Sequence, residues 1–158
     1  MAHREIPLSK PDITALEEQL VVDVLRSGRL SIGPMQEMFE DLVARRCGTR
    51  HGVACSSGTA GLHMVLLALG VGPGDEVVTT PFLFIASSNA ILFVGAKPVF
   101  VDICPSSLNA NPELVEAAIT PRTKAILAVE AFGSPCYMDT YAKIAAKYEI
   151  PLVEDSCE

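Results

Sequence analysis

The fold of this chain is decided by residues 51–101, HGVACSSGTAGLHMVLLALGVGPGDEVVTTPFLFIASSNAILFVGAKPVFV. Short apolar runs alternate there with longer apolar segments, and Gly, Pro and Ser separate them. Strands usually span about four to eight residues and helices ten or more, so length tells the two apart. The stretch predicts strands and helices in alternation. The strands are expected over 51–55, 76–80 and 98–101, and the helices over 59–69 and 83–94.

The same alternation continues toward the C-terminus. Asn111 is a suitable cap for a helix over 112–119, and another helix is predicted over 138–148. Strands are predicted over 124–129 and 151–154. All five predicted strands are apolar throughout, which is typical of parallel strands covered on both faces. The sequence therefore predicts an α/β fold of three layers, a mostly parallel sheet with helices on both faces.

Two helices are predicted before this alternating part. Apolar residues spaced three and four apart indicate a helix over 13–26, with Asp12 as its expected N-cap. Pro34 is well placed to begin the second helix. We therefore expect residues 1–50 to form an N-terminal helical segment and residues 51–158 to form a domain. Because the chain ends where the next helix should begin, we expect that domain to be truncated.

Composition and charge exclude several kinds of function. The 158 residues carry 12 Lys and Arg against 19 Asp and Glu, a net charge of −7, so no nucleic-acid partner is expected. Five cysteines without a C-x-x-C pair favour reduced thiols over disulfides or a metal site. The N-terminus lacks the apolar core of a signal peptide, and no apolar stretch is long enough to cross a bilayer. We therefore expect a cytoplasmic protein with no metal and no membrane partner.

Residues 55–61, CSSGTAG, join a predicted strand to a predicted helix. Ligands of parallel α/β sheets bind at this kind of junction, and free amides at a helix start bind phosphate. The hydroxyls of Ser57 and Thr59 can add hydrogen bonds. A tight turn in which Ser57 only caps the helix explains the same residues. The spacing is that of neither a Walker loop nor a G-x-S-x-G nucleophile elbow, so a phosphate-binding turn and a plain helix cap both remain open.

Two further features follow the ends of predicted strands. Phe82 and Phe84 come just after the second strand, where one of them can stack on a flat heterocycle or both can pack in the core. Asp155, which ends the last strand together with Glu154, can pair with a protonated ring nitrogen or cap a following helix. Glu130 follows the fourth strand and can face the same cleft, but the sequence indicates no role for it.

Long stretches of the chain carry these features in collinear order. They are SGRLSIGP at 27–34, SSGTAGLHMVLLALGVGPGDEVVTTPFLFIASSNAILFVGAKPVFVDI at 56–103, PELVEAAITPRTKAILAVEAFGSPCYMD at 112–139 and PLVEDSCE at 151–158. Together they resemble the DegT/DnrJ/EryC1/StrS family of pyridoxal-phosphate-dependent sugar aminotransferases, which have fold type I. The resemblance covers nearly the whole chain. It implies that residues 51–158 are part of a cofactor-binding large domain, without the family's C-terminal small domain.

The resemblance implies a role for six residues toward pyridoxal 5'-phosphate. The phosphate would be bound by three residues at the helix start, Gly58, Thr59 and Ala60. Phe84 would stack on the pyridine ring, and Asp155 would keep the ring nitrogen protonated, which makes the ring an electron sink. Glu158 stands near the ring hydroxyl, where the family usually has Gln or His. A carboxylate there would be repelled by that oxygen, so Glu158 is expected to be protonated or turned away.

For the full-length protein, the resemblance implies transfer of an amino group from glutamate to a nucleotide-linked keto sugar. Such a reaction would serve polysaccharide or antibiotic sugar biosynthesis, in a homodimer that completes the active site. The Schiff-base lysine of the family matches no lysine of this sequence and is expected beyond Glu158. A sugar 3-dehydrase of the same family, with histidine in place of that lysine, stays open. So does a catalytically inactive fragment. An unrelated phosphate-ligand binding module also stays open, and would hold Thr59, Phe84 and Asp155 far apart.

Overall fold

The computed structural model of the chain describes residues 7 and 10–157. The chain divides into two compact units, Met1–Ala54 and Cys55–Glu158. This division does not test the predicted boundary between residues 50 and 51, which stays a prediction. Within the described residues, no helix is both long and apolar enough to cross a membrane.

The first unit contains two helices, α1 (Ala15–Ser27) and α2 (Pro34–Cys47). The prediction of Asp12 as the N-cap of α1 is wrong, because Thr14 caps it. Thr14 Oγ1 accepts a hydrogen bond from the Leu16 amide, and Glu17 accepts one from the Thr14 amide at 2.7 Å. This reciprocal pair is a capping box, and Asp12 stands two residues too early to form it.

A four-stranded sheet forms the centre of the second unit, in the order β2-β1-β3-β4 with all neighbours parallel. Its strands are β1 (Glu76–Thr79), β2 (Lys97–Phe100), β3 (Thr123–Val129) and β4 (Leu152–Asp155). Four of the five predicted strands are therefore confirmed, together with their parallel arrangement.

The fifth predicted strand, over 51–55, is wrong. Residues 51–55 form no strand in the structure. The Ala54 amide donates to Glu40 Oε1 at 2.8 Å, so a side chain of α2 satisfies it in place of a neighbouring strand. The apolar run predicted burial, but three of the five residues, including Val53 at 77%, are exposed, and in the described part of the chain the segment has no neighbouring strand to pair with its backbone groups.

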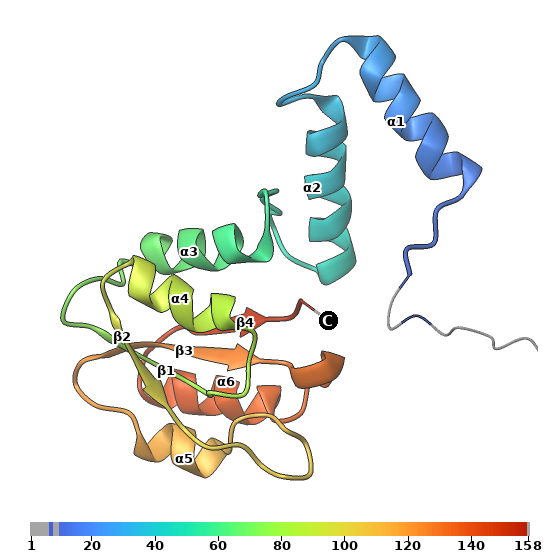
Figure 1. The fold of residues 1–158 in the computed structure, drawn as a ribbon. Coiled ribbons are helices and arrows are strands. Elements are labelled where there is room, and N and C mark those ends of the chain that lie inside the picture. Colours follow the sequence, from blue (N-terminus) through green and yellow to red (C-terminus); the bar gives the residue numbers. More distant parts are fainter. Residues whose placement is uncertain (1–6, 8–9, 158) are drawn as a thin grey trace, which may run out of the picture. The chain divides into compact units, whose positions relative to one another are not determined.

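Helices cover both faces of the sheet (Figure 1). One face carries α3 (Gly58–Ala68) and α4 (Ile85–Phe93), and the other carries α5 (Pro112–Ala117) and α6 (Met138–Lys147). Successive strand residues point to opposite faces. Val77 and Leu127 accordingly belong to the core under α3 and α4, and Val78 and Ile126 to the core under α5 and α6. The predicted three-layer α/β fold is confirmed.

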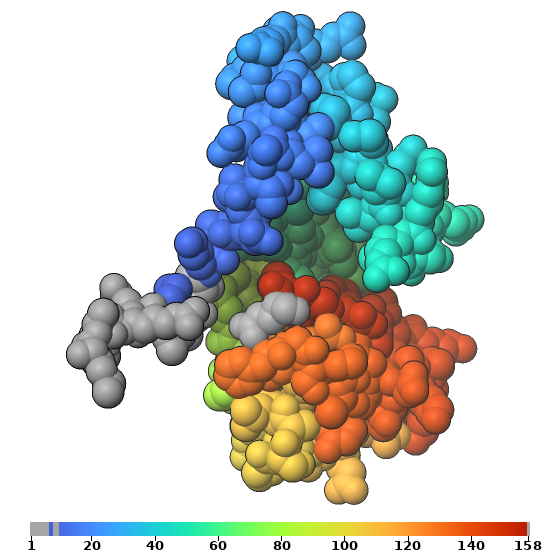
Figure 2. All heavy atoms as spheres, turned by 90° about the vertical axis from the view of Figure 1, so that its right-hand side faces the viewer, coloured from blue at the N-terminus to red at the C-terminus, as the bar shows by residue number. Residues whose placement is uncertain are grey.

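The strand order creates a switch point between β1 and β3. From β1 the chain crosses over to β2 on one side, and later continues to β3 on the other. In open parallel sheets, ligands bind at such a point, beyond the carboxyl ends of the strands. Figure 2 looks at this edge, where the segments that follow β3 (orange) and β4 (red) lie next to each other. The Glu130 amide joins them by donating to the Asp155 carbonyl at 3.2 Å.

Candidate functional site

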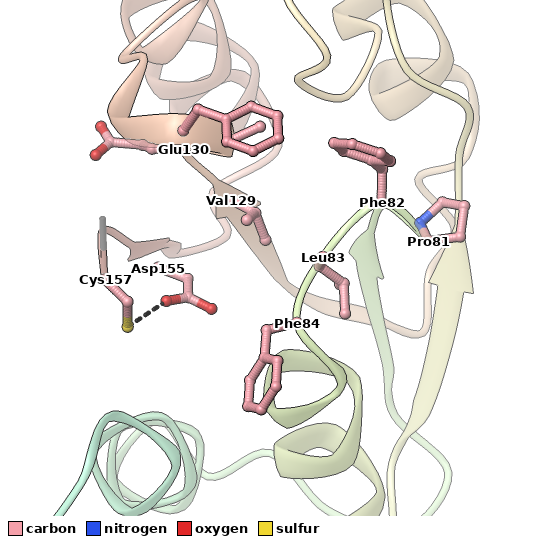
Figure 3. A pocket seen from close by; sticks show the side chains of 10 residues that line it. Pro81, Phe82, Leu83, Phe84, Val129, Glu130, Asp155 and Cys157 are labelled. Atoms are coloured by element: carbon pink, nitrogen blue, oxygen red, sulfur yellow. Dashed lines mark hydrogen bonds between the residues drawn. The ribbon is translucent and has the colours of Figure 1, made fainter. Parts of the chain in front are cut away.

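A cavity of about 370 Å³ opens at the switch point (Figure 3). Three strand ends supply its walls: the turn after β1, the turn after β3 and the end of β4. The lining residues are Pro81, Phe82, Leu83, Phe84, Val129, Glu130, Ala131, Phe132, Asp155 and Cys157. This volume lies within the range of small-molecule sites.

Asp155 is the buried acidic group of the cavity, with 9% of its surface exposed. Val153 packs in the core under α3 and α4, and the two-residue period of a strand puts Asp155 on the same face. Glu154 is exposed. Both carboxylate oxygens of Asp155 accept hydrogen bonds, Oδ2 from Ser87 Oγ at 2.5 Å and Oδ1 from Cys157 Sγ at 2.8 Å. The side chain is thus held in one orientation at the cavity wall.

The two phenylalanines after β1 differ in their surroundings. Phe82 packs edge-on against Phe132, with 6.2 Å between ring centroids. Phe84 is 77% exposed and forms the N-terminal boundary of α4. Figure 3 shows its side chain on the opposite side of the opening from Asp155. Of the two rings, Phe84 is the more exposed, at 77% against 42% for Phe82, and so has more of its surface open to a planar ligand.

The predicted phosphate turn lies beside this cavity. A Cβ atom on Gly58 would lie 3.0 Å from Sγ of the cavity-lining Cys157, so Gly58 and the end of β4 are neighbours. Thr59 and Ala60 are not among the lining residues. Ser57 caps α3, because its hydroxyl accepts from the Ala60 amide at 3.1 Å. The cap therefore occupies the Ala60 amide, and the amides of Gly58 and Thr59 remain as the helix-start donors.

The turn after β3 is held in shape by Asn109, which is 1% exposed. Its amide group donates to the carbonyls of Ser134 and Cys136, and its oxygen accepts from the Ala131 amide at 2.9 Å. Phe132, between these contacts, has a φ of 55°, which is uncommon for a bulky residue. Asn109 thus stabilises a turn that brings an aromatic ring to the cavity.

The structure brings Phe84 and Asp155 together around one cavity, with Gly58 adjacent to it. Glu158 lies outside the described residues. No lysine is among the described residues that line the cavity. In the described part of the chain, no group of His, Cys, Asp and Glu side chains is arranged to hold a metal ion. The arrangement combines a buried carboxylate, an exposed aromatic face and a helix start, which can respectively bind a cationic N–H, a flat ring and an anion.

Sequence reasoning missed three residues that shape this site, namely Ser87, Asn109 and Cys157. Ser87 was not distinguishable from its neighbours, since Ser88 and Asn89 are polar residues of the same helix, IASSNAILF at 85–93. Its partner, 68 residues away, was not detectable from spacing. Cys157 and Asn109 carry no local signal for their contacts.

Comparison with known proteins relates the whole of this site to one family. A family model described as the DegT/DnrJ/EryC1/StrS aminotransferase family matches residues 11–158. A UDP-4-amino-4-deoxy-L-arabinose–oxoglutarate aminotransferase of Shewanella sediminis is 41% identical over 99% of this chain and 40% of its own length. A UDP-2-acetamido-2-deoxy-3-oxo-D-glucuronate aminotransferase of Pseudomonas aeruginosa is 46% identical over 85% of this chain and 38% of its own length.

A solved structure agrees with the sequence matches. The crystal structure of NtdA from Bacillus subtilis with bound cofactor PMP superimposes with a TM-score of 0.87, at 37% identity, over 99% of this chain and 38% of that protein. The chain thus spans about two fifths of the length of the relatives that it matches. The family model nevertheless covers almost all of it, including every predicted site residue. The chain belongs to the DegT/DnrJ/EryC1/StrS aminotransferase family.

Proposed function

We propose that the protein that contains this chain is a pyridoxal-phosphate-dependent aminotransferase. It transfers an amino group from glutamate to a nucleotide-linked keto sugar. The names of the two curated relatives support the sugar-nucleotide substrate, and the PMP-bound structure supports the cofactor. The observation that carries the proposal is the buried carboxylate of Asp155, held at the switch-point cavity that the exposed ring of Phe84 also lines. We further propose that residues 51–158 belong to the cofactor-binding large domain and that the protein works as a cytoplasmic homodimer.

The residues present fit pyridoxal phosphate. Asp155 offers a fixed, buried acceptor for a ring N–H, and Phe84 offers an aromatic face near it. Gly58 has no side chain of its own to cover the backbone amides at this helix start, where a phosphate can bind. These three features lie at one edge of one sheet, as a cofactor with a ring and a phosphate requires.

Each residue then has a definite task. When bound, pyridoxal phosphate supplies a protonated ring that withdraws electrons from the reacting carbon. Asp155 holds the proton at the ring nitrogen, and Phe84 packs on the ring and excludes water from that face. The amides of Gly58 and Thr59 and the Thr59 hydroxyl bind the phosphate, and Ala60 contributes through its place in the first turn of α3. Glu158 is proposed near the ring hydroxyl.

The covalent anchor of the cofactor is proposed to be a lysine outside this sequence. Lys97 and Lys124 lie at the amino ends of β2 and β3, opposite the edge that forms the cavity. Lys143 and Lys147 belong to α6, and Lys147 pairs with Glu116 at 2.6 Å. None of these four lines the cavity.

The test measures nitrogen transfer by the full-length protein. Incubation with ¹⁵N-glutamate, pyridoxal phosphate and UDP-linked keto sugars should give a ¹⁵N-labelled amino sugar by mass spectrometry. In Asp155→Asn, which keeps the shape but removes the charge, the rate should fall by about a hundredfold, or roughly 3 kcal/mol of transition-state free energy. Glu154→Gln is the matched control, because its exposed carboxylate is the neighbour in sequence, and it should retain the rate.

Two results would contradict the proposal. A wild-type product that has lost a hydroxyl group and carries no ¹⁵N would indicate a sugar dehydrase. Equal rates in the two variants would mean that Asp155 does not hold the ring nitrogen.

A further inference from the structure

Ser87 carries a fully buried hydroxyl in the second unit. It lies in the first turn of α4 and is 0% exposed. Ile91, one helical turn further on, is also fully buried, so both residues belong to the face of α4 that packs inward. A hydroxyl buried in such a place without a hydrogen-bond partner costs free energy, so its partner is informative.

The partners of Ser87 are the two residues assigned to the cofactor ring. Ser87 Oγ lies 2.5 Å from Asp155 Oδ2 and 3.2 Å from the carbonyl oxygen of Phe84. The hydroxyl has one proton, and the nearer, charged carboxylate is the stronger acceptor. Ser87 therefore donates to Asp155 while it stays against the backbone of Phe84.

This bond distinguishes the two oxygens of Asp155. Oδ2 is taken by Ser87, and Oδ1 lies on the side of Cys157, which lines the cavity. Figure 3 shows the Cys157 thiol at this oxygen. A thiol is a weak donor, so a charged ring N–H displaces it readily from Oδ1.

We propose that Ser87 is a positioning residue for the cofactor. By fixing Oδ2, it turns Oδ1 of Asp155 toward the ring nitrogen and so keeps that nitrogen protonated. The proposal rests on the proposed function. It differs from a purely structural role, in which Ser87 would stabilise the fold but leave the protonation of the ring unchanged.

The experiment uses full-length protein loaded with pyridoxal phosphate labelled with ¹⁵N in the ring. The ¹⁵N chemical shift reports ring protonation, and quenching of protein fluorescence gives the cofactor dissociation constant. In Ser87→Ala, the shift should move toward the unprotonated value and binding should weaken by about tenfold, the worth of one hydrogen bond to a charged group. Ser87→Thr keeps the hydroxyl, so its ¹⁵N shift and dissociation constant should be close to those of the wild type. Ser87→Cys is a conservative variant with a weak donor, and its two values should lie between those of the wild type and Ser87→Ala.

Ser88→Ala is the matched control. Ser88 is the next residue of the same turn, is 6% exposed, and donates to the Ile85 carbonyl, away from Asp155. This variant should keep the wild-type shift and dissociation constant. The proposal is overturned if Ser87→Ala and Ser87→Cys both show the wild-type ¹⁵N shift, or if Ser88→Ala moves it equally. If the wild-type protein does not bind pyridoxal phosphate at all, the proposed function itself fails, which is a separate and recognisable result.

Discussion

Gly58 is the first residue of α3 and lies next to the thiol of Cys157. This contact explains why residue 58 is a glycine without reference to any ligand. A Cβ atom at residue 58 would lie 3.0 Å from Cys157 Sγ, closer than normal packing allows. Gly58 has no unusual backbone angle that would itself exclude alanine. The constraint is therefore steric and comes from the end of β4.

Gly58→Ala should consequently destabilise the protein only while Cys157 is present. Overpacking at this contact should cost about 1 kcal/mol. In the Cys157→Ala background the clash is absent, and the better helix propensity of alanine should make the substitution neutral or stabilising by up to about 1 kcal/mol. Urea unfolding of the wild type, both single variants and the double variant measures this coupling. Equal losses in the two backgrounds would show that the thiol is not the constraint.

The carboxylate of Glu76, which is almost fully buried, stabilises the amino end of strand β1. Glu76 is 4% exposed and accepts hydrogen bonds from Thr120 Oγ1 at 2.6 Å and Arg122 Nη2 at 2.8 Å. The Thr120 hydroxyl, followed by the Arg122 guanidinium, lowers the pKa of Glu76 below its ordinary value. The contacts join β1 to the turn before β3, at the end of the sheet opposite the cavity.

This pKa shift has a definite sign for stability. Because the folded-state pKa of Glu76 is below the unfolded one, the group stabilises the fold above the unfolded pKa, and that contribution is lost as pH falls through the folded pKa. Glu76→Gln should therefore lower the free energy of unfolding at pH 7. The difference from wild type should shrink as the pH falls below the unfolded-state pKa of Glu76 and through its lower folded-state pKa, because the wild-type side chain then becomes neutral as well.

Urea unfolding at several pH values checks this. Glu116→Gln is a suitable comparison, since Glu116 forms a more exposed ion pair with Lys147, and such pairs contribute little. A Glu76→Gln deficit that does not shrink at any acidic pH at which the protein still folds would assign the effect to packing and not to charge.

At the scale of the whole chain, the sequence predicted what depends on single elements and missed what depends on distant partners. Continuous apolar runs indicate strands that are covered on both faces of a sheet, so the four strands and the three layers could be predicted. The run at 51–55 forms no strand: Val53 is 77% exposed, and the Ala54 amide donates to a side chain, Glu40, and not to a neighbouring strand. Of the site, the places of Phe84 and Asp155 after strands indicated that both could face one cavity, and the cavity has both in its lining; their roles toward a cofactor came from the family resemblance and stay predictions. The place of Ser87 in the site could not be predicted, because it depends on a contact across 68 residues.

We expect the two cores on opposite faces of the sheet to differ in their effect on the site. Ile91 packs in the core between α4 and the sheet, one turn after Ser87, whereas Ile126 packs in the core on the opposite face. Both side chains are fully or almost fully buried, at 0% and 1% exposure. Replacing either with alanine should cost about 2–5 kcal/mol of stability, since the same atoms are removed from a packed core.

Of the two substitutions, only Ile91→Ala should change the affinity for pyridoxal phosphate. In Ile91→Ala, the cavity left below Ser87 allows the first turn of α4 to shift. Because this shift weakens the hydrogen bond from Ser87 to Asp155, pyridoxal phosphate should bind several-fold more weakly. In Ile126→Ala the sheet separates the defect from the site, and the dissociation constant should stay at the wild-type value. Both constants are measured in the full-length protein at a temperature well below the unfolding transition of either variant. If the two isoleucine variants lose equal stability and equal affinity, binding follows global stability and the site draws no special support from the α3–α4 layer.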